Sequence, residues 1–129
     1  MNLSDLSTPR LILDRHRLRA NTELMVRRIR SHGVALRPHA KTAKSAEVAR
    51  IASEDDNDML AVSTLLEASY FLESGFKDLI YAVCIAPDKL NGLEALYSRG
   101  ADLKIITDNP VAARAISDHP ASHKVLLEV

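Results

Sequence analysis

The sequence is poor in several residue types that mark particular protein classes. Its 129 residues include one cysteine, no tryptophan and four glycines, and aromatic residues make up 4%. A single cysteine forms no internal disulfide, which argues against a disulfide-stapled secreted domain and favours a reducing, cytoplasmic setting. Cys84 lies within the apolar run Leu79–Ile85, so we expect it to be a small, buried core residue.

The sequence also lacks an excess of charge and any long apolar run. Lys and Arg total 17, as do Asp and Glu, whereas a general nucleic-acid binder normally has a basic excess. No stretch approaches the ~20 apolar residues that span a bilayer. The first ten residues, MNLSDLSTPR, contain Asp5 and no apolar core, unlike a secretory signal. We therefore predict a cytoplasmic globular protein without nucleic-acid or membrane partners.

Short apolar segments recur along the chain at intervals of roughly 20 to 23 residues, the length of one strand plus one crossover helix. They are nearly continuously apolar, which is typical of parallel strands covered on both faces. The strand candidates are Val34–Leu36, Met59–Val62, Leu79–Ile85, Leu103–Ile106 and Val125–Val129.

Segments with helical periodicity lie between these strand candidates. Gly75 and Gly100 are suitable helix stops, and Asn109 followed by proline is a suitable helix start. The expected helices are 45–52, 65–72, 90–97 and one that begins at 110. Upstream, we expect a short strand at Leu11–Leu13 and a helix at Arg15–Arg30 with a solvated basic face.

The repeated βα units predict an α/β fold. The chain stops at the tail of an apolar strand, and a closed eightfold barrel needs about 250 residues. A small open sheet is the alternative. We expect the N-terminal part of a (β/α)8 barrel, with about five βα units and an apparent truncation.

The segment Arg37–Lys44, with the sequence RPHAKTAK, is the most unusual part of the chain. It follows a predicted strand and precedes a predicted helix, so we expect it at the carboxyl end of a strand, where βα folds build their sites. Side chains two residues apart on a strand share a face. Arg37, His39 and Lys41 are therefore expected to point the same way.

Three neighbouring cationic groups have a chemical consequence. Each charge opposes the next, which disfavours protonation of Lys41 and favours a free amine that attacks an aldehyde to form a Schiff base. The same cluster attracts an anion such as a phosphate. The alternative, from the local pattern alone, is a solvated basic loop without a ligand.

The same segment resembles the cofactor-lysine motif RPHxKTxK of the D-threonine aldolase and eukaryotic-type D-serine dehydratase family. These are fold-type III pyridoxal-phosphate enzymes with an alanine racemase-like N-terminal barrel. Further stretches are similar in the family's order and spacing, so the resemblance covers essentially the whole chain. Thr8–Asp14 resembles TPxLxLD, Leu60–Phe71 resembles TVATLxEAEYF, Gly75–Pro87 resembles GxxDILYAxPIxP, and Ala101–Asn109 also fits.

The resemblance implies a role for each residue on a motif position. Lys41 falls on the Schiff-base lysine, which holds pyridoxal 5'-phosphate and later acts as the base at the substrate's α-carbon. Arg37 and His39 fall on positions that make supporting cofactor contacts. Ser63 and Thr64 end the next strand, where the family places residues near the cofactor.

The sequence departs from the family in two respects. Ala43 stands where the best-known members have histidine. The motif therefore gives less support for assigning the chain to the dehydratases or to the aldolases. Family members continue into further barrel strands and a C-terminal β-domain with ligands for zinc or manganese, and none of this follows Val129. We therefore expect residues 1–129 to be a partial N-terminal pyridoxal-phosphate-binding barrel without metal ligands, the C-terminal β-domain being absent.

Two further polar groups are given no ligand role. The run Glu54–Asp58 lacks the spacing and the glycine of a calcium loop, so we expect a solvated turn. His119 and His123 flank a proline-containing loop and have no carboxylate or cysteine companions in the sequence. We expect them to be surface histidines.

The sequence thus predicts a pyridoxal-phosphate-dependent lyase that acts on small D-amino acids, above all D-3-hydroxy amino acids. The reaction implied is retro-aldol cleavage or β-elimination, and the family's tendency is to homodimers. Little or no activity is expected of these 129 residues alone. The alternatives are an amino-acid racemase and a cofactor-binding or structural α/β domain without turnover.

Overall fold

Four parallel strands form one sheet in the order of the sequence. In the computed structural model, which describes residues 2–53 and 57–129, the sheet order is β1-β2-β3-β4. All three strand pairs are parallel. The strands are β1 (Met59–Val62), β2 (Asp78–Cys84), β3 (Asp102–Thr107) and β4 (Lys124–Leu127). The α/β class and the four strand positions predicted downstream of residue 58 are confirmed.

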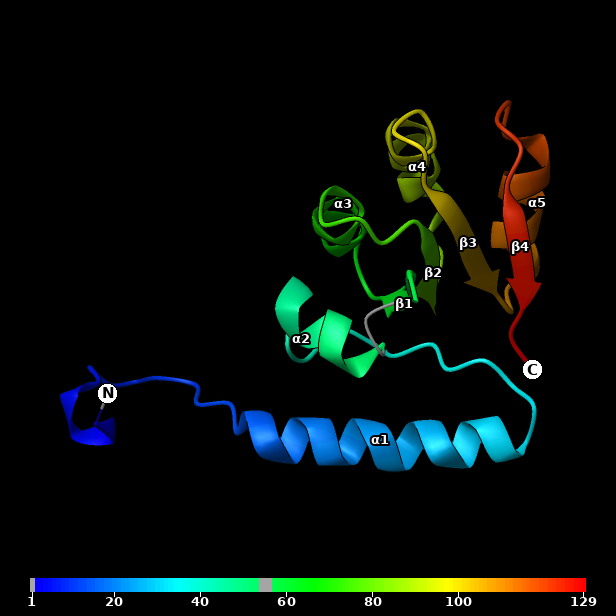
Figure 1. Cartoon of the computed structure of the whole chain (residues 1–129). Helices are drawn as coiled ribbons and strands as arrows, with labels where there is room; N and C mark the ends of the chain where they lie inside the picture. Colours follow the sequence, from blue (N-terminus) through cyan, green and yellow to red (C-terminus); the bar gives the residue numbers. More distant parts are fainter. Residues whose placement is uncertain (1, 54–56) are drawn as a thin grey trace.

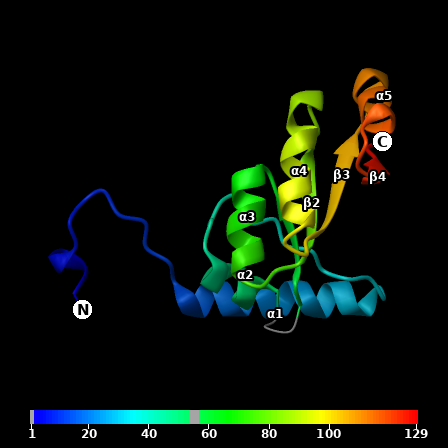
Figure 2. The same cartoon turned by 90° about the horizontal axis from the view of Figure 1, so that it is seen from above.

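Helices alternate with these strands. Figure 2 shows α3, α4 and α5 standing in a row, and Figure 1 shows α1 running across the base of the molecule. No helix among the described residues is long and apolar enough to cross a membrane. The helices are α1 (Arg15–Ser31), α2 (Ala46–Ala52), α3 (Leu65–Glu73), α4 (Leu90–Tyr97) and α5 (Pro110–Asp118), with 3-10 turns η1 (Leu3–Asp5) and η2 (Pro87–Lys89).

Polar side chains at the helix starts explain where the helices begin. The side chains of Asp14, Ser45, Thr64 and Asn109 each accept a hydrogen bond from a backbone amide in the first turn of α1, α2, α3 and α5. Such caps satisfy amides that have no partner inside the helix. Thr64 and Asn109 therefore fix where the connections that follow β1 and β3 end.

One face of the sheet packs on the helices and carries the core. Leu79 and Tyr81 in β2 and Leu103 and Ile105 in β3 are each at most 1% exposed. The residues between them, which point to the other face, are only partly buried. The prediction that both faces are covered is therefore wrong for the described residues, whose helices pack on one face.

Cys84 is on the less covered face, and so the prediction of a buried core cysteine is also wrong. Its residue is partly exposed, and it lies beside a register shift between Tyr81 and Cys84 in the β2–β3 ladder. The apolar run around it alternates in burial, and Val83 is 43% exposed. Alternating burial is the pattern of a sheet that is packed on one side.

The segment before β1 docks on that strand without becoming a regular strand. His39 forms an isolated parallel bridge with Ala61. The amide of Ala61 donates to Pro38 O at 2.8 Å, and the amide of Ala40 donates to Ala61 O at 2.9 Å. Continuing this ladder toward Met59 requires an amide at position 38, which proline lacks.

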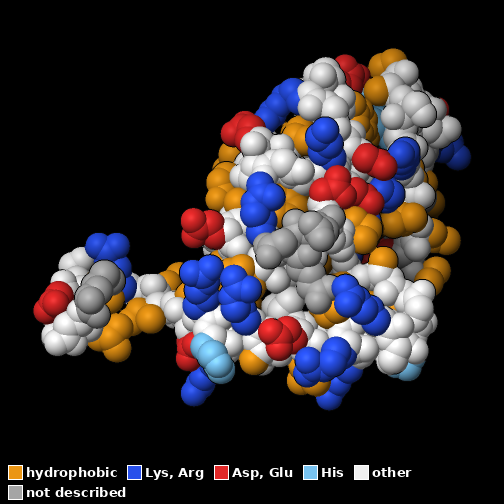
Figure 3. All heavy atoms as spheres, in the orientation of Figure 1, with side chains coloured by type: hydrophobic (Ala, Val, Ile, Leu, Met, Phe, Trp, Pro, Cys, Tyr) orange, Lys and Arg blue, Asp and Glu red, His pale blue; other side chains and the backbone are white. Residues whose placement is uncertain are grey.

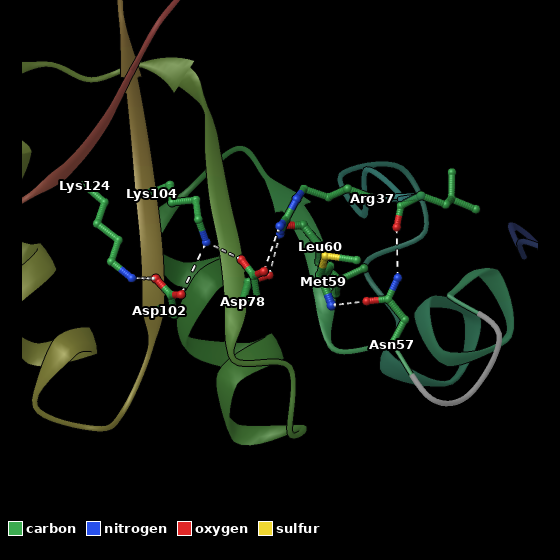
Figure 4. Close-up of polar contacts among 9 residues, drawn as sticks. Arg37, Asn57, Met59, Leu60, Asp78, Asp102, Lys104 and Lys124 are labelled. Carbon is green, nitrogen blue, oxygen red and sulfur yellow. Dashed lines mark hydrogen bonds and ion pairs between the residues drawn. The ribbon is translucent and has the colours of Figure 1, made fainter. Parts of the chain in front are cut away.

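The side chain of Asn57 takes over where the ladder stops (Figure 4). Its amide nitrogen donates to Leu36 O at 2.9 Å, and its oxygen accepts from the amide of Met59 at 2.9 Å. The side-chain amide thus lies between two backbone groups that would pair directly in a regular parallel ladder. The predicted strand at Val34–Leu36 is therefore irregular, but its backbone remains attached to β1.

The chain before α1 differs from its prediction. Leu11, Ile12 and Leu13 are 101%, 63% and 54% exposed, and no strand includes them. Figure 1 shows this segment extending away from the sheet. A strand needs a hydrogen-bonding partner, and none of the described residues supplies one. The predicted helix at Arg15–Arg30 is confirmed as α1, and Figure 3 shows basic side chains on the surface along the base of the molecule, where this arginine-rich helix lies.

A row of alternating charges connects the amino ends of the strands (Figure 4). Asp78 lies 2.9 Å from Arg37 Nη2 and 2.6 Å from Lys104 Nζ, and Asp102 lies 3.4 Å from Lys104 Nζ and 2.7 Å from Lys124 Nζ. Burial opposes ionisation of Asp78, but hydrogen bonds from Arg37 and Lys104 outweigh it and lower the pKa of the carboxyl. This charge row ties the segment around residue 37 to β2, β3 and β4.

The charge row predicts that Asp78→Asn destabilises the chain at pH 7 by about 1–3 kcal/mol, less than a fully buried pair because water still screens these groups. The contribution of the ionised Asp78 carboxylate to the free energy of unfolding is fully present above the unfolded pKa of about 3.9. It is lost as the pH falls through the lower pKa of the folded state. Urea unfolding at pH 7 and pH 3 should therefore give a large difference between wild type and variant at pH 7 and a smaller one at pH 3.

Asp118→Asn is the matched control, because Asp118 is exposed and its side chain forms no hydrogen bond or ion pair within residues 2–53 and 57–129. We expect it to leave the free energy of unfolding unchanged within ~0.5 kcal/mol. Equal losses in the two variants at pH 7 would contradict a stabilising role for the charge row.

Candidate functional site

The turn that carries Lys41 lies at the carboxyl edge of the sheet. The chain leaves the bridge at His39, turns over residues 40–43, and enters α2 after its cap Ser45. The amide of Lys44 donates to Ala40 O at 3.0 Å and closes the turn. The prediction that this motif lies at a strand's carboxyl end agrees with this placement.

Lys41 presents its amine from this turn. The residue is exposed, and none of the side chains in residues 2–53 and 57–129 forms a hydrogen bond or ion pair with its amine. Its backbone is held, since the amide donates to His39 Nδ1 at 3.3 Å. A primary amine without an ion-pair partner is available for attack on an aldehyde. The donor chemistry at this position therefore fits pyridoxal phosphate.

His39 connects the turn to the end of β1. Its Nε2 lies 3.4 Å from Ser63 Oγ, and its Nδ1 accepts from the Lys41 amide, which places the ring proton on Nε2 when the imidazole is neutral. Burial lowers the pKa of His39 and the charge of Lys41 lowers it further, while the carboxylate of Glu67 opposes them. The structure thus places His39 between the backbone of Lys41 and the side chain of Ser63.

Glu67 is a buried carboxylate beneath this group. It is 7% exposed, accepts from the amide of Ser63 at 2.8 Å, and lies 3.1 Å from Lys44 Nζ. Burial would raise its pKa, but the hydrogen bonds from Ser63 and Lys44 outweigh burial and lower it. Sequence reasoning missed this residue. The spacing of Thr64 and Glu67, which is that of a capping box, was the available signal.

Thr64 lies next to the group but uses its hydroxyl oxygen locally. The Oγ1 atom accepts from the amide of Glu67 at 3.0 Å and thereby caps α3. Its residue is exposed at the carboxyl edge, on the connection that follows β1. A cofactor contact from Thr64 stays a prediction.

The structure does not bring Arg37 to Lys41. The guanidinium donates to Leu60 O at 3.4 Å and to Asp78 O at 2.6 Å, at the amino ends of the strands (Figure 4). Lys41 lies in the turn beyond the bridge at His39, so Arg37 and Lys41 occupy opposite ends of the segment. The predicted convergence of three cations is therefore wrong, and Arg37 in this arrangement ties the sheet together.

A small cavity of about 40 Å³ lies under the turn, lined by residues that include Pro38, Ala43, Val48 and Leu60. Its walls are largely apolar, which disfavours ordered water there. Ala43 is one of the residues that line it, at the position where the resembling family carries histidine. The turn is consequently loosely packed on α2 at this point.

A second polar group occupies the same edge at the ends of the other strands. The thiol of Cys84 lies 3.2 Å from Asp108 Oδ1 and 3.0 Å from Glu128 Oε2. Its hydrogen bonds to Glu128 and then to Asp108 raise its pKa to about 11. The thiol is therefore a hydrogen-bond donor at neutral pH and a poor nucleophile.

His119 and His123 are not freely solvated, contrary to the prediction of surface histidines. His123 Nε2 lies 2.9 Å from His119 Nδ1, His119 Nε2 lies 3.0 Å from Asn91 Oδ1, and Tyr97 Oη lies 3.0 Å from His123 Nδ1. Both rings are partly buried in this chain of hydrogen bonds. Across the described residues, no group of three or more His, Cys, Asp or Glu side chains is arranged to hold a metal ion.

The predicted solvated turn at Glu54–Asp58 falls largely outside the described residues, which omit 54–56. Asn57, at its end, makes the contacts with Leu36 and Met59 given above, and Asp58 is exposed.

Comparisons with known proteins find relatives of this chain. The alanine racemase N-terminal domain family matches residues 13–129. D-threo-3-hydroxyaspartate dehydratase of Delftia sp. (strain HT23) is 42% identical over 89% of this chain, which spans 30% of that protein. D-threonine aldolase of Arthrobacter sp. is 32% identical over 98% of this chain and is covered over 35% of its length.

A solved structure gives the same picture. The crystal structure of an Ala racemase-like protein from Idiomarina loihiensis superposes with a TM-score of 0.91 at 35% identity, covering 98% of this chain and 35% of that one. The chain therefore spans about a third of the length of the proteins it matches.

The site predicts that pyridoxal phosphate followed by borohydride reduction labels Lys41 selectively, because its unpaired amine lies beside His39 at the carboxyl edge of the sheet, where βα folds build their sites. Peptide mapping of the reduced chain should find the label at Lys41 and lose it in Lys41→Ala.

Lys77→Ala is the control, because Lys77 is exposed and precedes β2 at the opposite edge of the sheet. It should leave the Lys41 label intact. Labels scattered over many lysines, and unchanged in Lys41→Ala, would show that the chain holds no organised site.

Proposed function

Because the chain belongs to the alanine racemase N-terminal domain family, we propose that it supplies the cofactor lysine of a pyridoxal-phosphate-dependent lyase acting on D-amino acids. The observation that carries the proposal is the unpartnered amine of Lys41 at the carboxyl edge of the parallel sheet. Sites of βα folds are built at this edge. The substrates we propose are D-3-hydroxy amino acids, as in the names of the dehydratase and the aldolase that resemble this chain.

In this proposal the residues of the edge have separate tasks. The amine of Lys41 would hold pyridoxal phosphate and, when released, would take up the proton of the substrate's α-carbon. His39 fixes the backbone of Lys41 through Nδ1 and offers its Nε2–H at the same edge. Thr64 contributes a hydroxyl proton from the connection that follows β1. Pyridoxal phosphate, when bound, supplies an electron sink for charge that develops at the α-carbon.

Of the reactions open to such a site, we propose loss of water from a 3-hydroxy amino acid first. The Delftia dehydratase has the higher identity, 42%, against 32% for the Arthrobacter aldolase. Retro-aldol cleavage is the second candidate, because the same site geometry serves either bond. The resemblance implies a zinc or manganese ion, and we propose no residue of this chain as its ligand.

Two alternatives follow from the fold alone. A racemase uses the same α-proton chemistry without breaking a further bond, and a cofactor-binding domain without turnover needs only Lys41. The proposal also includes a cytoplasmic location, in keeping with the single cysteine, and a homodimer as the assembly.

A chimera tests the reaction class. The chain replaces the matching segment of the Delftia dehydratase, and ammonia release is measured with D-threo-3-hydroxyaspartate, D-serine and D-threonine. We expect β-elimination that falls by more than about 100-fold in Lys41→Ala, the loss typical of removing a general base. Acetaldehyde and glycine from D-threonine would identify the aldolase instead, and α-proton exchange alone would identify a racemase.

Uptake of the cofactor by the chimera is the control for folding. A chimera that takes up the cofactor and reacts equally well with and without Lys41 would refute the role of this lysine. One that takes up the cofactor but turns over no D-amino acid would favour the domain without turnover.

A further inference from the structure

Glu67 is a buried carboxylate to which the proposed function assigns no task. A carboxylate that is only 7% exposed is rarely tolerated without charged or hydrogen-bonding partners. Its partners come from two different segments, the Lys41 turn and the connection between β1 and α3. This position is unusual for a residue that merely stabilises a helix start.

The carboxylate joins these segments with separate oxygens. Oε1 lies 3.1 Å from Lys44 Nζ, and Oε2 accepts from the amide of Ser63 at 2.8 Å. The amide of Glu67 itself is held by the Thr64 hydroxyl at 3.0 Å, so its own backbone is fixed at the start of α3. Lys44 ends the turn, and its amide closes the turn by donating to Ala40 O. The end of the Lys41 turn is thus connected through one side chain to the end of β1.

Lys44 also has a backbone conformation that needs support. Its φ of +46° lies in the left-handed region, which residues other than glycine adopt uncommonly. Such conformations persist where surrounding contacts hold them, and they occur often at functional sites. The Lys44 side chain is 64% exposed, so packing does not hold it, and the small cavity under the turn leaves the loop loosely packed. Besides the bond from its own amide to Ala40 O, Lys44 is held among the described residues by the ion pair of its side chain with Glu67.

We propose that Glu67 is a positioning residue for Lys41: by holding Lys44 and Ser63, it sets the turn that presents the Lys41 amine at the sheet edge. This inference deepens the proposed function and rests on it for the role of Lys41. Glu67 also supplies a negative charge in direct contact with this lysine-bearing turn. Its charge acts on His39 as well, since it opposes the lowering of the His39 pKa by burial and by Lys41.

Two neutralising variants test the ion pair on the full chain. Glu67→Gln keeps the size and the acceptor for the Ser63 amide but removes the charge, and Lys44→Gln removes the partner at an exposed position where folding is not at risk. The pyridoxal-phosphate concentration that gives half-maximal labelling of Lys41 after borohydride reduction should rise on the order of tenfold in each variant. This is the scale expected when a reacting group is misplaced. The double variant should match the single ones, because both remove the same contact.

Two conservative variants complete this set. Lys44→Arg keeps the charge, and its half-maximal labelling of Lys41 should need a pyridoxal-phosphate concentration near that of wild type. Glu73→Gln is the matched control on the same helix, since Glu73 is 67% exposed and pairs only with Arg99 and Ser69 at the surface. It should leave the labelling of Lys41 unchanged. Additive losses in the double variant, or equal losses in Glu73→Gln, would overturn the proposal.

Two cofactor-free measurements separate this inference from the proposed function. Amide exchange at Lys44, which reports the closed turn, should be faster in Glu67→Gln and Lys44→Gln than in wild type. An NMR titration should show a lower pKa for the His39 ring in Glu67→Gln, which a purely steric role of Glu67 would not cause. Unchanged exchange and an unchanged titration overturn the positioning role, whatever the cofactor result. Scattered labelling in wild type, with both cofactor-free changes present, overturns the cofactor site and leaves the Glu67 contact standing.

Discussion

The attachment of residues 36–40 to β1 is the constraint on which the site depends. Two backbone hydrogen bonds flank His39, one from Ala61 to Pro38 O and one from Ala40 to Ala61 O. Since Pro38 has no amide hydrogen, a regular ladder cannot extend below this bridge, and the side chain of Asn57 occupies the interrupted position. Attached in this way, the chain must leave the sheet at its carboxyl edge, where it turns and presents Lys41.

Charge is distributed differently at the two ends of the sheet. At the amino ends, Arg37, Asp78 and the neighbouring lysine and aspartate neutralise one another, so these groups stabilise the sheet and leave no free cation among them. At the carboxyl edge, Lys44 is paired with Glu67, whereas no described side chain pairs with Lys41. An unpaired lysine amine at the edge where βα folds build their sites, rather than an excess of positive charge, is what makes this edge suitable for an aldehyde cofactor.

The regular part of the fold was predictable from the sequence, and the irregular part was not. Strands such as Met59–Val62 and helices such as Leu65–Glu73 follow from apolar periodicity and from caps, which are local properties. The prediction failed at Leu11–Leu13, because a strand requires a partner that apolar composition does not reveal. It also failed for Cys84, because an apolar run does not show whether one or both faces of a sheet are covered.

The candidate site was predictable in its lysine and less so in its surroundings. The RPHAKT motif and its position after a strand indicated Lys41 and His39, which the structure places together. The prediction that Arg37 converges with these two residues was wrong. It rested on the alternation of side chains along a strand, which gives the face but not the distance along the strand. Glu67 was missed because its partner in the turn, Lys44, is more than twenty residues away in the sequence. The local sequence around Glu67 shows only the spacing of a capping box.

Amide hydrogen exchange at Ala40 tests the central claim most directly, because this amide bonds to Ala61 O and its protection requires the attached arrangement. The comparison is with Thr42, whose amide has no hydrogen-bond partner in the part of the chain that the structure describes. We predict that Ala40 is protected to the same degree as the amides of β1, while Thr42 exchanges freely. If Ala40 exchanges as fast as Thr42, the segment is not held on β1 and the placement of Lys41 at the sheet edge is wrong.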